Sequence, residues 1–293
     1  MDLHVGQQGL LALFAWRSPG LMAKKELLEE IWPEEVPKSG LNALQARVSR
    51  LRRAFTSCEP GQTRDRLRAH PGGYRLTLDD IDCDFLRFDR LRREASAVTG
   101  DPVRALRLLD TALALWRGPA LHGAELGSAG RKVAATLDDV RLLTLAEAIG
   151  LRLSLGRHRE VVPDLQDLVA RHPYEEIFHD QLIVALYRCG RPQQALAVYG
   201  RLRRNLVEGF GMEPSPALQQ RMREVLRNND AALGASWDRE GGVGATAAPP
   251  LSGAPRTPTV TPEPYDDPWS RHVTQPRSKH TEPCSEYRRV SNF

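Results

Sequence analysis

The sequence predicts a mainly α-helical protein made of three consecutive parts. Three short helical patterns and one hairpin pattern fill residues 1–80, and amphipathic helical patterns then follow one another to residue 230. The last part, residues 231–293, holds nine of the 21 prolines and shows no sustained apolar period. We therefore expect two folded domains, residues 1–80 and 81–230, followed by a disordered C-terminal tail over residues 231–293.

The composition is that of a soluble protein with an apolar core. Of the 293 residues, 41% are hydrophobic and 27% are charged, and the mean hydropathy is -0.43. No apolar run is long enough to span a membrane, and no secretion signal opens the chain. The four cysteines have no zinc-site spacing, so we expect reduced thiols, no metal and a cytoplasmic protein.

Three helical patterns open the chain. Residues 7–17 and 24–32 place apolar side chains at helical spacing, and turn residues or a proline end each pattern. A longer helix is predicted over residues 40–55, with an apolar stripe made of Leu41, Leu44, Val48, Leu51 and Phe55. Small, polar and basic side chains occupy its opposite face, namely Asn42, Ala43, Ala46, Ser49, Arg50 and Arg53, with Arg47 at the margin.

A β-hairpin pattern follows the basic helix. The segments 66–69 and 74–78 flank the turn sequence His-Pro-Gly-Gly over residues 70–73. Residues 42–77 contain eight arginines and two acidic residues, a local charge of +6 against +4 for the whole chain. Considered without the hairpin, the basic string at residues 50–53 is equally compatible with an ordinary solvated helix surface. Two helices, a basic helix and a hairpin, in this order, indicate a winged helix-turn-helix, whose third helix enters the DNA major groove.

Two strings of this region resemble a known family. LNALQARVSRLRRAF (41–55) and RLRAHPGGYRL (66–76) resemble the winged-helix DNA-binding domain, of the OmpR class, in antibiotic regulatory proteins of the AfsR/DnrI/RedD type, abbreviated SARP. The resemblance implies binding to direct repeats in promoters and contact with RNA polymerase. Asparagine and arginine side chains can each form two hydrogen bonds with one base edge. The base contacts would therefore come from Asn42, Ser49, Arg50 and Arg53. The DNA backbone and wing contacts would come from Arg47, Arg66, Arg68 and Arg75.

The helical region contains an internal repeat. Residues 155–162 resemble residues 189–196, and Gly156 and Gly190 are 34 residues apart, which is the tetratricopeptide period. A more distant copy covers residues 99–106. Each glycine is expected in a turn between helices, where a positive φ or a close approach is needed. Small residues after the turns, Ala105, Ala195 and Ala197, are expected to permit close helix packing in a tetratricopeptide-like solenoid.

The family resemblance continues through this region. The stretches 112–121 (ALALWRGPAL), 151–176 and 182–219 are similar to the tetratricopeptide-like bacterial transcriptional activation domain of the same regulators. A long helix is predicted over residues 132–155. The sequence Pro214-Ser215-Pro216 is expected to open a last helix over residues 217–226.

Two functions compete for this sequence. The first is a sequence-specific transcriptional activator of a biosynthetic gene cluster, which binds double-stranded DNA, contacts RNA polymerase, forms a homodimer on the DNA and joins the nucleoid when bound. The second is a tetratricopeptide-like protein-binding scaffold with a vestigial DNA-binding domain. Phosphate-binding loops, nucleophile elbows and metalloprotease motifs are missing from the sequence, so we expect no enzyme, no catalytic residue and no cofactor. A gel shift with the neighbouring promoters separates the two functions.

The sequence departs from the family at its start. OmpR-class winged helices begin with a small antiparallel sheet, and residues 1–6 are too few to form one. Without that sheet, we expect part of the apolar surface formed by Leu10, Leu11, Leu13, Phe14 and Trp16 to face water. An upstream start codon is favoured over a trimmed paralogue, because the third helix and the wing keep their residues.

Removal of the tail provides a first test. A chain that ends at Asn229 is expected to fold and bind DNA as the full chain does, because the tail lacks a core-forming pattern. Thermal unfolding of both chains measures this. A large drop in melting temperature would contradict the prediction and would indicate that residues such as Tyr265, Trp269 or Tyr287 anchor the tail.

Overall fold

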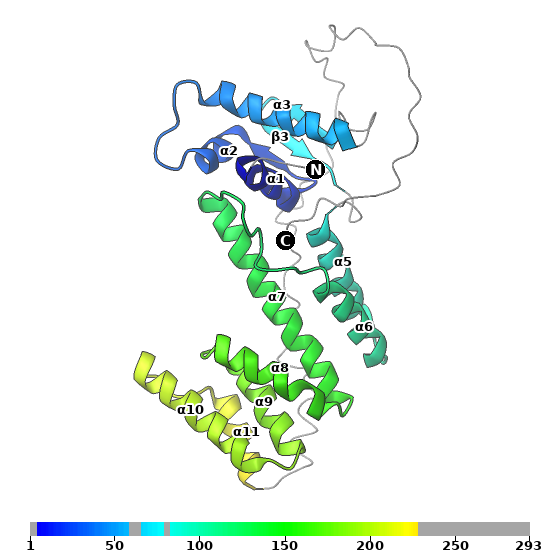
Figure 1. Cartoon of the computed structure of the whole chain (residues 1–293), viewed down its shortest axis with the longest axis vertical. Helices are drawn as coiled ribbons and strands as arrows, with labels where there is room; N and C mark the ends of the chain where they lie inside the picture. Colours follow the sequence, from blue (N-terminus) through cyan, green and yellow to red (C-terminus); the bar gives the residue numbers. More distant parts are fainter. Residues whose placement is uncertain (1–4, 59–65, 79–82, 228–293) are drawn as a thin grey trace. The chain divides into compact units, whose positions relative to one another are not determined.

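The computed structural model describes residues 5–58, 66–78 and 83–227 (Figure 1). The described chain is mainly helical, with one three-stranded sheet, and it divides into two compact units. The first unit contains the described residues up to Cys83 together with Ala124–Ser128, and the second contains Asp84–Gly123 and the described residues from Ala129 onwards. The tail predicted over residues 231–293 lies outside the described residues.

The first unit combines three helices with an antiparallel sheet of order β1-β3-β2. Its elements are α1 (Val5–Arg17), β1 (Leu21–Ala23), α2 (Lys24–Ile31), α3 (Gly40–Cys58), β2 (Leu67–His70) and β3 (Gly73–Leu76). The helices and the hairpin strands lie within three residues of their predicted bounds. The sequence did not predict β1, because three residues between a Pro-Gly turn and a helix are too few to show an alternating pattern.

The core of the first unit lies between the sheet and the helices. Four members of the α3 stripe are buried, namely Leu44, Val48, Leu51 and Phe55. The fifth expected member, Leu41, is 53% exposed, because it stands in the first turn of α3 at the edge of the stripe.

The expectation that α1 exposes apolar surface is wrong for four of the five residues named, whereas Trp16 is partly exposed. Leu10, Leu11, Leu13 and Phe14 are each at most 6% exposed. A helix that is apolar on several sides requires neighbours on several sides, and α1 packs against α3, β1 and β3. The Phe14 ring meets the edge of the Tyr74 ring of β3 at a centroid distance of 6.4 Å.

Helices are the regular elements of the described part of the second unit. They are α5 (Asp84–Ala97), α6 (Pro102–Leu113), α7 (Ser128–Ser154), α8 (His158–Arg171), α9 (Glu176–Arg188), α10 (Pro192–Phe210) and α11 (Pro216–Leu226). Helix α5 packs on α6, and α9 packs on both α8 and α10. The three glycines of the internal repeat, Gly100, Gly156 and Gly190, all have a positive φ, which confirms the predicted reason for glycine in these turns.

The small residues after the turns behave differently from one another. Ala105 and Ala195 are buried, as expected for close helix packing. Ala197 is exposed, contrary to expectation, because two helical positions beyond Ala195 turn its side chain by about 200° away from the core. The predicted last helix is α11, which begins one residue earlier than expected, at Pro216. The Ser215 hydroxyl caps it by accepting a hydrogen bond from the Leu218 amide at 3.4 Å.

The string at residues 112–121 leads from the end of α6 into a loop that is fixed on α7. The Trp116 ring stands edge-on to the Phe88 ring at 5.3 Å, and the Arg141 guanidinium lies 5.0 Å above the Trp116 ring. Arg141 also donates a hydrogen bond to the Gly118 carbonyl at 2.9 Å. One arginine of α7 therefore holds both the tryptophan and the backbone that follows it.

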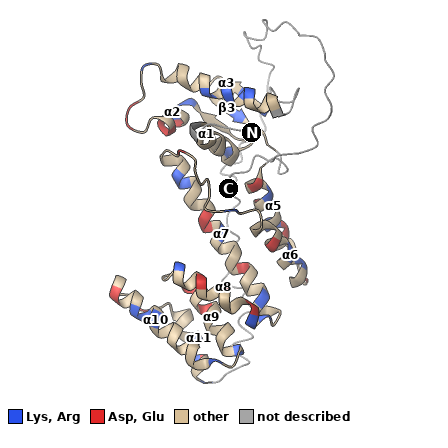
Figure 2. Cartoon of the chain, viewed as in Figure 1, with Lys and Arg blue, Asp and Glu red and all other residues tan. Residues whose placement is uncertain are grey.

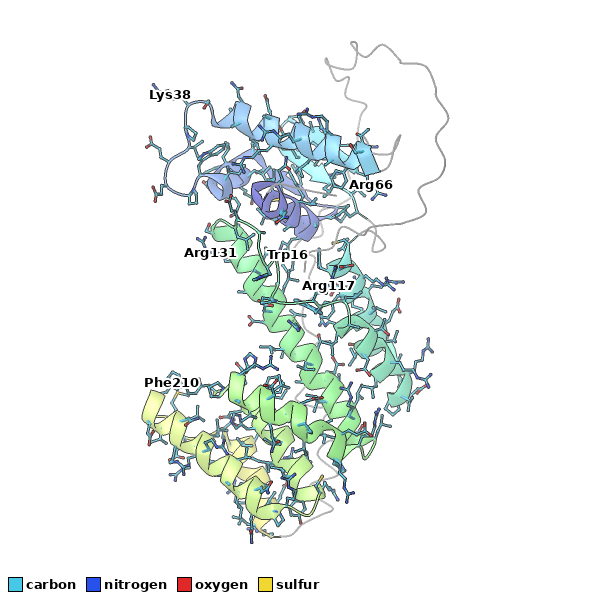
Figure 3. The ribbon with its side chains drawn as sticks, viewed as in Figure 1. Trp16, Lys38, Arg66, Arg117, Arg131 and Phe210 are labelled. Atoms are coloured by element: carbon cyan, nitrogen blue, oxygen red, sulfur yellow. The ribbon has the colours of Figure 1, made fainter. Side chains whose placement is uncertain are left out.

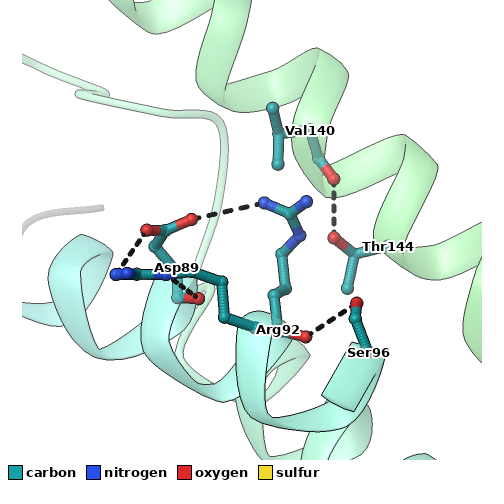
Figure 4. A network of polar contacts seen from close by, with 6 residues as sticks. Asp89, Arg92, Ser96, Val140 and Thr144 are labelled. Atoms are coloured by element: carbon teal, nitrogen blue, oxygen red, sulfur yellow. Dashed lines mark hydrogen bonds and ion pairs between the residues drawn. The ribbon is translucent and has the colours of Figure 1, made fainter. Parts of the chain in front are cut away.

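A buried carboxylate organises α5 beside this loop (Figure 4). The Asp89 side chain is 3% exposed and lies 2.8 Å from Arg93 and 3.5 Å from Arg92. Burial lowers the pKa of the Arg92 guanidinium, while Asp89 acts in the opposite direction. Arg92 also lies 5.8 Å above the Phe88 ring, and the charge of Glu147 on α7 acts on the pKa of Arg92 in the same direction as Asp89.

Substitution of this carboxylate tests its contribution to stability. Asp89→Ala is expected to lower the free energy of unfolding by about 3 kcal/mol, because it removes the ion-pair partner of the buried Arg92. Asp167→Ala is the matched control, since Asp167 pairs with Arg171 in solvent and such exposed pairs contribute little. Urea unfolding of the two variants measures the difference, and equal midpoints would contradict the assignment.

Candidate nucleic-acid interface

Helix α3 carries a continuous basic face. It contains four arginines and no acidic residue, so only the Lys and Arg colour appears on it among the charged residues of Figure 2. The four residues predicted to address bases are all exposed on this helix, namely Asn42, Ser49, Arg50 and Arg53. The buried stripe occupies the opposite side of α3, so the basic face points away from the core of the first unit.

The charges on this face are not neutralised within the described part of the chain. Arg50 and Arg53 have no ion pair with any described carboxylate. Several arginines of the second unit are instead paired, as in Arg152–Asp110 at 2.5 Å and Arg203–Glu213 at 2.6 Å. Guanidinium groups that lack a carboxylate partner on one helix face attract an anionic partner.

Two further arginines of α3 have structural contacts. The Arg47 guanidinium lies 5.7 Å from the centre of the Trp32 ring and is half-buried, in agreement with its place at the margin of the face. Arg52 was not among the predicted site residues. Its Nε donates a hydrogen bond to the Leu67 carbonyl at 3.0 Å, so Arg52 fixes α3 to β2.

The hairpin brings two predicted residues together. Arg68 on β2 is directly opposite Arg75 on β3, and both side chains are exposed. Leu67 and Leu76 form the neighbouring pair on the buried face of the sheet. Like charges directly across a ladder repel, so the hairpin concentrates positive charge on its outer face.

The hairpin turn is fixed to the start of α2. Lys24 donates from its backbone to the Gly72 carbonyl at 3.0 Å and from its Nζ to the Pro71 carbonyl at 3.1 Å. Gly73 is required there, because a Cβ at this position would lie less than 3.0 Å from the backbone of Met22. Arg66 precedes β2 beyond the last turn of α3, and Lys38 precedes the first turn of α3 (Figure 3).

His70 is a titratable group of the hairpin that the sequence patterns did not indicate. Burial lowers the pKa of its imidazole, and the charges of Arg75 and Arg68 lower the pKa further. Its Nε2 is buried without a hydrogen-bond partner among the described residues. The imidazole therefore reports the positive potential of the hairpin.

The charged groups that α3 and the hairpin expose together are basic side chains. The described residues include no cluster of three or more histidine, cysteine or carboxylate side chains that could hold a metal ion. None of the described helices is long and apolar enough to cross a membrane. What the structure does gather is a basic helix face and a basic hairpin in one compact unit.

The chain is similar to a family model, to transcriptional regulators and to one solved structure. Residues 83–226 match the family model of the bacterial transcriptional activator domain. The chain is 38% identical to the transcriptional regulator RedD of Streptomyces coelicolor, over 74% of this chain and 61% of RedD. It is 34% identical to the regulatory protein DnrI of Streptomyces peucetius, over 74% of this chain and 82% of DnrI.

Longer relatives and a solved structure extend the comparison. The chain is 34% identical to the regulatory protein AfsR of Streptomyces coelicolor, over 77% of this chain and 22% of AfsR. The chain thus spans less than two thirds of RedD and about a fifth of AfsR. The structure of Mycobacterium tuberculosis EmbR in complex with a low-affinity phosphopeptide matches with a TM-score of 0.74 and 27% identity, over 80% of this chain and 64% of that chain.

The potential of the hairpin can be measured at His70. Arg75→Gln is expected to raise the pKa of His70, because one of the two charges that disfavour the imidazolium is removed. The pKa should stay below its usual value, since burial, the larger cause, remains. An NMR titration of the imidazole measures the shift. Arg53→Gln on α3 is the control, and an equal shift in both variants would refute the local origin of the effect.

Proposed function

The chain belongs to the SARP family of transcriptional regulators, and from this premise we propose that it activates a biosynthetic gene cluster by binding promoter DNA. The observation that carries the proposal is the acid-free exposed face of α3, on which Arg50 and Arg53 remain without carboxylate partners among the described residues. Double-stranded DNA offers phosphates and base edges to such a face.

The proposed organisation assigns one task to each part of the chain. Residues 1–80 form a winged helix-turn-helix, with α3 as the recognition helix and β2–β3 as the wing. Residues 81–230 form a tetratricopeptide-like activation domain that contacts RNA polymerase. The order of helices and strands in the first unit supports the first assignment, and the positive-φ glycine turns of the second unit support the second.

The proposed roles divide the arginines into two classes. Arg50 and Arg53, with Asn42 and Ser49, address base edges from α3 in the major groove. Arg47, Arg66, Arg68 and Arg75 hold the DNA backbone. The position of Arg68 directly opposite Arg75, with both side chains exposed, supports this second role, because one phosphate can contact both guanidinium groups.

The proposal also covers the setting in which the protein acts. Binding occurs at direct repeats in the promoter, with a homodimer on the DNA, and the protein is cytoplasmic and joins the nucleoid when bound. It acts without a cofactor and is not an enzyme, in keeping with relatives that are transcriptional regulators. The alternative, a protein-binding scaffold with a vestigial DNA-binding domain, differs in that it requires no affinity for DNA.

Substitutions on α3 test the base-reading role. Arg50→Ala or Arg53→Ala should weaken binding to a cognate promoter duplex by about 1–3 kcal/mol, if the side chain bonds a base. Arg204→Ala is the matched control, since Arg204 is also an exposed helix arginine but belongs to the second unit. Titration of labelled duplexes measures the affinities.

Substitutions near the hairpin provide the contrast within the same experiment. Arg66→Ala or Arg75→Ala should weaken binding to promoter and random duplexes alike and reduce the slope of log affinity against log salt by about one unit. If the α3 variants bind both duplexes with unchanged affinity, the division into base-reading and backbone-holding arginines is wrong. If the unaltered chain binds neither duplex, the scaffold function replaces the proposal.

A further inference from the structure

Five residues from the middle of the chain complete the first unit. Ala124–Ser128 follow α6 in the sequence, yet they cluster with α1, α2 and the sheet. They lie outside residues 1–80, where the sequence predicts the DNA-binding domain to end. Their contacts explain why so distant a segment belongs there.

The first contact is a close approach of backbones at α1. A Cβ on Gly9 would lie less than 3.0 Å from the carbonyl oxygen of Glu125 and 3.5 Å from the side chain of Leu126. Real Cβ atoms do not approach a carbonyl oxygen so closely, and backbone cannot yield as the end of a long side chain can. Only glycine at position 9 permits this packing.

The second contact is at the end of α2. A Cβ on Gly127 would lie less than 3.0 Å from the carbonyl oxygen of Glu30 and 2.6 Å from its carboxylate Oε2. Glu30 is itself 8% exposed. The segment therefore packs against α1 through Gly9 of that helix and against α2 through its own Gly127. Backbone atoms lie at both contacts, and backbone cannot move aside as easily as a flexible side chain.

The third observation connects the segment with α3. A cavity of about 170 Å³ is lined by Gly9, Glu125 and Gly127, by Ile31 of α2 and by Arg47 of α3. Arg47 lies above the ring of Trp32, which directly follows α2. The end of α2, the start of its connection to α3 and the middle of α3 therefore meet at one place, and the segment forms one wall of it.

We propose that Glu125–Gly127 is a positioning element for the DNA-binding helix α3. It sets the end of α2 against α1, and through Trp32 and Arg47 it sets the orientation in which α3 presents Arg50 and Arg53. This inference rests on the proposed DNA-binding function. It also means that the DNA-binding unit is incomplete when cut at residue 80, because one wall of the cavity between α1, α2 and α3 is formed by residues that follow α6.

The test uses the full chain, and three variants each replace one glycine by alanine, so that each adds one methyl group. Gly127→Ala and Gly9→Ala each place a methyl group where backbone atoms now lie, whereas Gly118→Ala is the matched control because no atom lies within 4 Å of a Cβ there. Leu126→Ala is a milder variant that adds no clash, in case the first two variants fail to fold. Binding to a promoter duplex and to a random duplex is measured well below the melting temperature.

A positioning role predicts a split between the two duplexes. Gly127→Ala, Gly9→Ala and Leu126→Ala should bind the promoter duplex roughly tenfold more weakly, the loss expected when one base contact is misplaced. Binding to the random duplex should change by less than about twofold, because it depends on charge more than on orientation. Gly118→Ala should match the unaltered chain on both. Equal losses on both duplexes, or no loss, would overturn the proposal.

Hydrogen exchange separates this inference from the function on which it rests. In Gly127→Ala, the amides of α1, the end of α2 and the middle of α3 should exchange faster than in Gly118→Ala. If the unaltered chain does not discriminate the two duplexes, the proposed function fails and the exchange data alone decide whether the segment positions α3. Unchanged exchange at α3 would then overturn the positioning role.

Discussion

The first unit depends on one steric constraint, the approach of β3 to β1 at Gly73. The absence of a side chain there lets β3 take the central place in the sheet, with β1 on one side and β2 on the other. From this place Tyr74 packs on Phe14 of α1, and Leu76 faces Leu67 in the core. The alternation of side chains then directs Arg75 outward. A backbone requirement thus sets both the core contacts and the direction of a charge.

The arginines of the described chain make different kinds of contact. In the second unit, ion pairs such as Arg221–Asp180 at 2.8 Å join helices that are distant in sequence, in this case α11 and α9. In the first unit, Arg52 serves the fold through a carbonyl, while Arg50 and Arg53 on the same helix are left without a described carboxylate. Neighbouring arginines of one helix therefore differ, because Arg52 holds the fold and Arg50 and Arg53 are exposed to solvent. Sequence proximity alone does not reveal the division.

Local patterns predicted most of the elements and much of the candidate site. Helical spacing located α3 with its basic face, and glycine spacing located the turns with positive φ. Two failures, the exposure of Leu41 and of Ala197, follow from the place of each residue on its own helix, and the others concern relations between distant residues. The strand β1 exists only through pairing with β3, the burial of α1 follows from neighbours on several sides, and the role of Arg52 depends on a carbonyl 15 residues away. Gly9 and Gly127 show no local signal at all, since each is required by backbone from another part of the chain.

The two arginines that face each other on the hairpin make the stability of the free protein depend on the anions of the buffer. Arg68 and Arg75 are both exposed and directly opposite each other across the ladder, so an anion that binds near both of them in the folded protein favours the folded state. In the proposed function, the same anions would compete with DNA phosphates for the hairpin. Buffers rich in phosphate or sulfate should therefore preserve the isolated protein best while they weaken the proposed binding to DNA, and dilute chloride should have the opposite effect on both.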